Sequence, residues 1–325
     1  MLITARMPNM DILRREGLTI EGAYSQTRCG PSRIAFMTGK YPHSVGNQGD
    51  NVGDTHDPHG IPLDIKYFPQ HLQQNGYDTH FYGKWHLGFC DKRLKPNHRG
   101  FDSAFGFMGA GIGYYNHYGD QIPGKSSKYF DYWRNDEFVD HVGDEKTYCT
   151  DDYINEFNTM MDNRVNTNDT DPFFVYMAFN APHAPHSAPA EAYLQRHANS
   201  PRKDYWATVT RMDWNVGRMI QKLKETGDFE NTIFIYQSDN GEKEGVGSYP
   251  LRGMKSSFAE GGTRVPAFIS GPGIKKGTLD RLDFIHLSDW GPTILDFAGI
   301  DPKAGFLVVT NIFLYHIYSY LKSLQ

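Results

Sequence analysis

Cysteine is scarce in this chain, which has only Cys29, Cys90 and Cys149 among its 325 residues. Three cysteines are too few for the disulfide framework of a small secreted fold. If Cys29 has a chemical role, Cys90 and Cys149 remain available to pair, and the sequence does not decide whether they do. Positive charge is not in excess either, because the net charge is −5, which argues against a general nucleic-acid-binding protein. A few cations in one pocket could still bind an anionic substrate.

The sequence also lacks a long, uninterrupted apolar run. The first 20 residues contain none, so we expect neither a signal peptide nor a membrane anchor at that end. Residues 306–321 are apolar and aromatic, but Asn311 and His316 interrupt them and the segment is short for a membrane span. A pair of buried strands and an atypical tail produced by splicing both fit this segment, and we favour the tail.

Strand-like and helix-like segments alternate along the chain, which predicts an α/β fold with a mostly parallel central sheet flanked by helices. The clearest helix covers residues 205–224, where apolar side chains recur on one face before Thr226-Gly227 ends it. We expect the other helices at 8–16, 31–40, 67–74, 150–160 and 289–297. We expect strands at 78–82, 173–179, 232–237 and 265–270.

Two of these strands, FFVYMAF at 173–179 and TIFIYQ at 232–237, are almost continuously apolar. Strands of that composition are usually buried on both faces of a helix-covered sheet. Each is followed by polar residues, Asn180-Ala181-Pro182-His183 after the first and Ser238-Asp239-Asn240-Gly241 after the second. Because ligands of open α/β sheets bind beyond the carboxyl ends of strands, these residues indicate a site.

The strongest local motif is Cys29-Gly30-Pro31-Ser32-Arg33. Proline is well suited to the first turn of a helix, so Cys29 would lie at a helix N-terminus. That end carries partial positive charge and unpaired N–H groups, and Arg33 adds a full charge one turn later. The pattern therefore predicts a nucleophile placed where an anion binds.

This motif resembles the C-x-P-S-R signature of the type I sulfatases, in which the cysteine is oxidised to formylglycine. Other segments in the same order resemble the family as well: GKWHLG at 83–88, NAPH at 180–183, SDNG at 238–241, and PLRGMK at 250–255 followed by EGGTRVP at 260–266. The resemblance runs from about Pro8 to Gly299. Within the family, Pro62-Leu63-Asp64 and Arg99-Gly100-Phe101-Asp102 look most like arylsulfatase B and its close relatives.

The resemblance implies an alkaline-phosphatase-like fold and a role for each matching residue. Lys84 and Lys255 would hold the sulfate oxygens. His183 would protonate the leaving oxygen, and His86 would position the formylglycine diol and take its proton. Arg33 would hold the hydroxyl of the modified Cys29. His186 and Lys243 are near-neighbours that remain alternatives to the predicted His183 and Lys255.

A divalent cation, calcium by resemblance, would be bound by Asp239, Asn240 and the modified Cys29. The family also has a buried N-terminal strand ending in two aspartates, and no Asp-Asp pair precedes Cys29 here. Half of the metal site and a central strand are therefore expected to be absent, which would leave backbone groups on the neighbouring strands unpaired. At 254–258 the chain reads MKSSF where relatives often carry a tryptophan.

We expect residues 1–304 to form an incomplete catalytic domain, with an apolar tail at 305–325 replacing the family's C-terminal subdomain. The implied substrates are sulfated sugars of the glycosaminoglycan type or aryl sulfates, and the implied partner is the formylglycine-generating enzyme. The family's compartments are the lysosome, the endoplasmic reticulum and the extracellular space, where the sequon Asn168-Asp169-Thr170 could be glycosylated. A truncated, non-catalytic protein and a hydrolase of phosphate or phosphonate esters are the alternatives.

Overall fold

The computed structural model describes residues 7–47, 58–121, 128–139, 147–187, 191–243 and 248–303. Its α-helices are α1 (Pro8–Arg15), α2 (Cys29–Thr38), α3 (Phe68–Gln74), α4 (Cys149–Thr167), α5 (Glu191–Arg196), α6 (Lys203–Thr226), α7 (Glu260–Thr263) and α8 (Trp290–Phe297). The six helices expected from the sequence are confirmed, and α4 extends beyond its predicted end. Residues 1–6 and the apolar tail at 305–325 lie outside the described residues.

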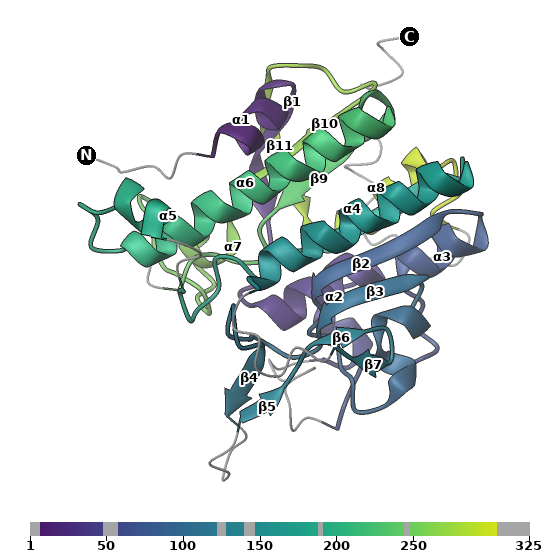
Figure 1. Ribbon diagram of the computed structural model, residues 1–325, viewed down its shortest axis with the longest axis horizontal. Helices are drawn as coiled ribbons and strands as arrows, with labels where there is room; N and C mark the ends of the chain where they lie inside the picture. The colour runs from purple at the N-terminus through teal and green to yellow at the C-terminus, as the bar shows by residue number, and fades with distance from the viewer. Residues whose placement is uncertain are drawn as a thin grey trace.

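The strands form two main sheets and a two-stranded ribbon (Figure 1). They are β1 (Gly17–Tyr24), β2 (Asp78–Lys84), β3 (Ser103–Phe107), β4 (Tyr118–Gln121), β5 (Lys128–Phe130), β6 (Trp133–Arg134), β7 (Glu137–Phe138), β8 (Phe173–Ala178), β9 (Phe234–Gln237), β10 (Ala267–Ser270) and β11 (Thr278–His286). All four strands expected from the sequence are confirmed. The other seven described strands were not expected, and among them β1 and β11 have alternating and charged residues that lack the long apolar pattern of β8.

The predicted α/β class is confirmed, although the sheets are mixed rather than mostly parallel. One sheet has the order β7-β6-β3-β2-β8, with β2 parallel to both β3 and β8. The other has the order β11-β1-β10-β9, in which β1 is parallel to β11 and antiparallel to β10. Helices α1, α4 and α6 cover one side of the sheets, and α2, α3 and α8 cover the other (Figure 1).

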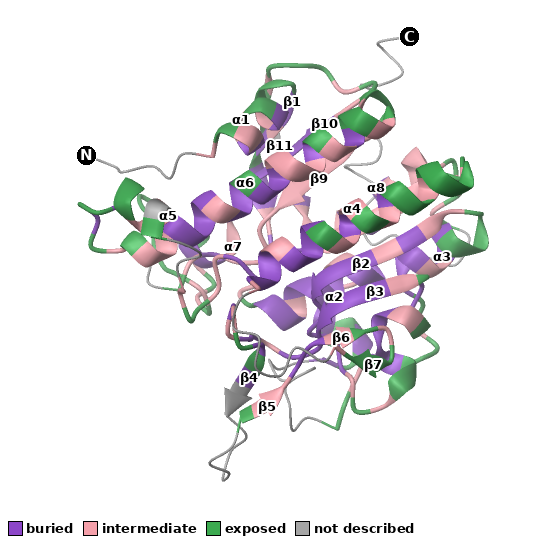
Figure 2. Ribbon diagram, in the orientation of Figure 1, coloured by how far each residue is buried: buried purple, intermediate pink, exposed green. Residues whose placement is uncertain are grey.

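Strands β8 and β9 end their respective sheets and both border one large cavity. The cavity has a volume of about 1840 Å³, and its lining includes every residue of the two strands. Only Ala178 of β8 is fully buried. The residues of β9 are all partly exposed, whereas most of β2 is buried (Figure 2). The prediction that these two apolar strands are buried on both faces is therefore wrong for the described chain, because their residues line this cavity and are only partly buried. The cavity lies beside their second edges, with which no described strand pairs.

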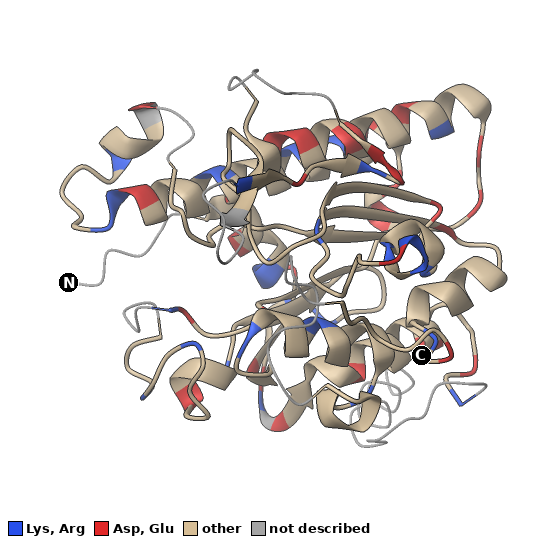
Figure 3. Cartoon of the chain, turned by 90° about the horizontal axis from the view of Figure 1, so that it is seen from below, with Lys and Arg blue, Asp and Glu red and all other residues tan. Residues whose placement is uncertain are grey.

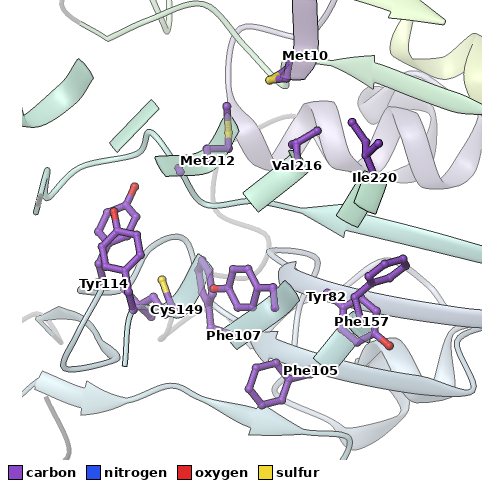
Figure 4. Packing of buried hydrophobic residues seen from close by; sticks show 14 of the residues in the cluster. Met10, Tyr82, Phe105, Phe107, Tyr114, Cys149, Phe157, Met212, Val216 and Ile220 are labelled. Carbon is purple, nitrogen blue, oxygen red and sulfur yellow. The ribbon is translucent and has the colours of Figure 1, made fainter. Parts of the chain in front are cut away.

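The apolar core lies between the helices and the sheets. In one cluster, Met10 of α1 and Met212 and Val216 of α6 lie on one side, and Tyr82 and Phe107 of the five-stranded sheet lie on the other (Figure 4). Asp213 joins the two helices, since its carboxylate accepts the backbone N–H of Met10 at 2.8 Å. The N-terminal turn of α1 is thereby fixed to the middle of α6.

The described charges are mixed in sign along the elements (Figure 3). Ion pairs join neighbouring helices, since Arg211 and Lys222 of α6 pair with Asp151 and Asp162 of α4. Among the described residues, no helix has the length and hydropathy needed to cross a membrane.

Candidate active site

Cys29 is the first residue of α2, as the motif predicted, and its side chain is only 5% exposed. Arg28 before it has an extended backbone, so the chain turns sharply into the helix. The Ser32 hydroxyl accepts the backbone N–H of Gln26 at 3.1 Å and holds this turn. The helix ends at Gly39, where φ is 64°, a left-handed conformation that glycine adopts without strain.

Cationic groups surround the Cys29 thiol. The Lys255 ammonium donates to its sulfur at 3.1 Å, and Lys84 is 2% exposed at the end of β2. Burial and the Asp239 carboxylate oppose ionisation of the thiol. Lys84, a hydrogen bond with His86, and Lys255 outweigh them and lower the pKa of Cys29 to about 6. The site therefore favours negative charge at the position of the predicted nucleophile.

Arg33 connects three parts of the site from the first turns of α2. Its guanidinium donates to the Lys84 carbonyl and lies 3.2 Å from the Asp239 carboxylate. It also reaches the Tyr176 hydroxyl at 3.4 Å. Because Arg33 is only 5% exposed, these contacts fix the end of β2 and the loop after β9 relative to Cys29.

The two predicted histidines occupy different environments. His86 is buried and has φ of 55°, a conformation that costs a non-glycine residue energy and that often marks a functional constraint. His183 follows β8, and its Nδ1 lies 2.7 Å from the Ala184 carbonyl, which assigns the Nδ1 proton to that bond. Burial, Lys84 and Lys255 lower the pKa of His183 to about 3, so its ring is neutral in the free protein.

Asp239 and Asn240 lie directly after β9, as predicted. Burial opposes ionisation of Asp239, but Arg33, Lys84, Lys255 and His183 lower its pKa to about 2. The buried Oδ1 of Asn240 has no hydrogen-bond partner in the described structure, while its Nδ2 donates to the Gly241 carbonyl at 2.8 Å. The Asp239 carboxylate and the unsatisfied amide oxygen of Asn240 are the types of ligand that a hard cation prefers.

These oxygens are too few for a complete calcium site. Calcium takes six to eight oxygen ligands. Among the described residues, no group of three or more His, Cys, Asp or Glu side chains could hold a metal ion.

The structure adds positioning residues that the sequence patterns did not indicate. The Tyr176 hydroxyl contacts Arg33, but Tyr176 reads as an ordinary apolar strand residue. Ser256 has φ of 75°, and its N–H donates to the Thr27 carbonyl at 2.8 Å. This bond ties the segment that carries Lys255 to the segment that precedes Cys29.

His186 and Lys243, the alternatives to His183 and Lys255, have different surroundings. Lys243 is exposed, and His186 packs edge-on against the Tyr205 ring, with centroids 5.3 Å apart. The open question of a Cys90–Cys149 pair is also settled, because both are free thiols. Cys149 is buried beside Asn180, and burial raises its pKa to about 12.

Comparison with known proteins agrees with this arrangement. The sulfatase family model matches residues 3–300. Mouse arylsulfatase J is 36% identical over 298 residues, covering 90% of this chain and 48% of that protein. Rat N-acetylgalactosamine-6-sulfatase is 30% identical over 316 residues, covering 91% of this chain and 58% of that protein. The chain thus spans about half the length of these curated relatives.

A solved structure shows the same similarity in three dimensions. It is described as Ps i-CgsB in complex with k-i-k-neocarrahexaose, and it superposes with a TM-score of 0.86 at 31% identity. The match covers 98% of this chain and 72% of that one. With the family model matching most of its length, the chain belongs to the sulfatase family.

Proposed function

We propose that this chain carries the catalytic centre of a sulfuric ester hydrolase that uses residue 29 as its nucleophile. The observation that carries the proposal is the 3.1 Å contact between the Lys255 ammonium and the Cys29 sulfur, with Lys84 and Arg33 buried close by. A sulfate ester is an anion, and the cations reduce its repulsion from the nucleophile. Asp239 offsets only part of this positive charge.

Conversion of Cys29 to formylglycine would supply, after hydration, one hydroxyl to attack sulfur and a second whose deprotonation expels sulfate. Lys84 and Lys255 would bind the sulfate oxygens and stabilise the charge that develops on them in the transition state. Arg33, fixed by the Lys84 carbonyl and Asp239, would hold a hydroxyl of residue 29 in place. A serine or an unmodified cysteine could attack but would keep the sulfate bound.

Two histidines would move the protons. His183 would donate a proton to the leaving ester oxygen. It is neutral in the free site, but a bound sulfate would offset the charges of Lys84 and Lys255 and raise its pKa. His86, already hydrogen-bonded to the side chain of residue 29, would accept the proton released when sulfate leaves.

Asp239, Asn240 and an oxygen of the modified residue 29 would hold a calcium ion in the active enzyme. When bound, such an ion lowers the pKa of a coordinated hydroxyl and orients the ester. The unsatisfied Asn240 Oδ1 supports this role. The small number of described ligands favours the second candidate function, a non-catalytic sulfatase-like protein that only binds sulfated glycans.

The relatives suggest the substrate class. One is named for sulfate on N-acetylgalactosamine, and the solved structure holds a carrageenan-type hexasaccharide. Sulfated sugars are therefore the proposed natural substrates, with aryl sulfates as convenient probes. The formylglycine-generating enzyme is the proposed processing partner, and the lysosome or the extracellular space the proposed location. The exposed Asn168 would then carry a glycan, which digestion with a peptide N-glycosidase would detect.

The test combines mass spectrometry with turnover. The full chain is coexpressed with a formylglycine-generating enzyme, and the peptide containing residue 29 is examined for the aldehyde. Hydrolysis of 4-nitrophenyl sulfate is compared with that of 4-nitrophenyl phosphate, with calcium present. We expect sulfate turnover in the converted protein, at most one turnover in Cys29→Ser, and none in Cys29→Ala. Efficient conversion without sulfate turnover would support the non-catalytic candidate, and preferred phosphate turnover would support a phosphate ester hydrolase.

A further inference from the structure

Two β-strand edges face one cavity between the sheets. β8 pairs with β2 on one edge, β9 pairs with β10 on one edge, and no described strand pairs with the other edge of either. All residues of both strands line the same cavity of about 1840 Å³. Exposed strand edges are templates for pairing with a further strand.

The cavity is also apolar above and below the strands. On the side of α1 and α6 its lining includes Met10, Met212 and Val216, three residues that Figure 4 shows in the core. On the side of α2 and α8 it includes Phe36, Ile294 and Phe297. A strand placed between β8 and β9 would therefore be covered on both faces, and its sequence would have to be almost continuously apolar.

We propose that this cavity accepts one added β-strand and that residues 306–315 of the same chain, FLVVTNIFLY, supply it. The segment is uncharged and rich in β-branched and aromatic residues, which favour strands. Six of its residues would span roughly 20 Å at 3.3 Å per residue, enough to match the length of β8.

The C-terminal end of α8 lies near the end of the cavity at which β8 and β9 begin. Phe297 packs in the same cluster as Ile233, just before β9, and Ala298 packs in the same cluster as Phe174, near the start of β8. Phe297 and Ala298 both line the cavity. A segment entering there would run parallel to both strands. Its covalent attachment gives it a millimolar-range effective concentration, so it competes well against segments from other molecules.

Photocrosslinking in the full chain tests the occupant. The photoreactive residue 4-benzoylphenylalanine replaces Phe313, and crosslinked peptides are mapped by mass spectrometry. We expect crosslinks within one chain to residues 172–179 or 232–238. The matched control places the same group at Phe258, which is 93% exposed and should not crosslink to those strands. Crosslinks from position 313 that reach only other surfaces, or that join two chains, would overturn the proposal.

Hydrogen exchange provides a second readout that does not depend on ester hydrolysis. In the double variant Val308→Pro and Ile312→Pro, peptides from β8 and β9 should exchange roughly tenfold faster than in the wild type, because their second edges lose a partner. Peptides from β3 and β1 should be unchanged. Equal exchange rates of β8 and β9 in the two proteins would contradict the proposal, whether those rates are slow or fast. A strand with two prolines cannot pair on both edges, so a paired segment 306–315 would have been lost in the variant.

Discussion

The ammonium of Lys255 lies 3.1 Å from the sulfur of Cys29, although 226 positions separate the two residues. The contact forms because the segment carrying Lys255 is bound to the segment before α2 through Ser256 and Thr27. Two segments far apart in the sequence thereby place a cation against the predicted nucleophile.

This contact predicts how the unconverted thiol ionises. In protein made without the formylglycine-generating enzyme, alkylation of Cys29 by iodoacetamide should rise with pH around a midpoint near 6. Lys255→Ala removes a cation that stabilises the thiolate, so the midpoint should move to higher pH. Lys243→Ala, at an exposed lysine of the preceding segment, is the matched control and should leave it unchanged. An alkylation midpoint that is the same in both variants would show that Lys255 does not stabilise the Cys29 thiolate.

Replacing Arg33 with methionine should lower both activity and stability. The change removes the charge beside Asp239 and the donor to the Lys84 carbonyl. Because Asp239 is partly exposed, we expect a loss of about 1–3 kcal/mol in the free energy of unfolding, below the range for a fully buried pair. Sulfate turnover should fall by about 100-fold or more. Urea titration measures the first effect. Arg14→Met, at an exposed pair with Asp11, should change stability by less than about 0.5 kcal/mol.

His80 should make the fold less stable in mild acid. Burial is the largest influence on this ring and lowers its pKa to about 4, and its Nδ1 lies 2.8 Å from the Ser103 hydroxyl. Between about pH 6.5 and pH 4 the unfolded chain binds a proton that the folded chain does not, so stability falls as the pH falls through this window.

His80→Gln keeps a polar partner for Ser103 but does not titrate. Between pH 7 and pH 4.5 the wild type should therefore lose roughly 2 kcal/mol more unfolding free energy than the variant. Urea titrations at a series of pH values measure the difference. His43→Gln, at an exposed histidine, controls for the loss of one histidine. Wild-type and His80→Gln curves that stay parallel down to pH 4.5 would show that folding does not lower the pKa of His80.

Calcium should bind weakly to the unconverted protein. Asp239 and Asn240 offer suitable oxygens, but the described residues supply too few ligands, so we expect a Kd of about 1 mM or weaker by calorimetry. Asn240→Ala should abolish the signal and is cleaner than a change at Asp239, which would also leave Arg33 without its carboxylate. Micromolar binding would mean that further ligands join the site from outside the described residues.

Sequence patterns predicted the local elements well because their causes are local. Pro31 and Gly39 mark the two ends of α2, and the apolar face of residues 205–224 matches α6. The apolar runs at 173–179 and 232–237 did form strands. The prediction of their burial was wrong. Burial of each strand depends on what lies beside its second edge, and the sequence of the strand does not specify that neighbour.

The sequence by itself determined the family motifs, the order of helices and strands, and the placement of Cys29 at a helix N-terminus. Only the tertiary structure decided that Arg33 pairs with Asp239 across 206 positions and that Tyr176 joins them. It also decided that β8 and β9 face one cavity. Local conformation follows from the propensities of neighbouring residues, whereas charge coupling and strand pairing depend on distances that exist only after the chain has folded.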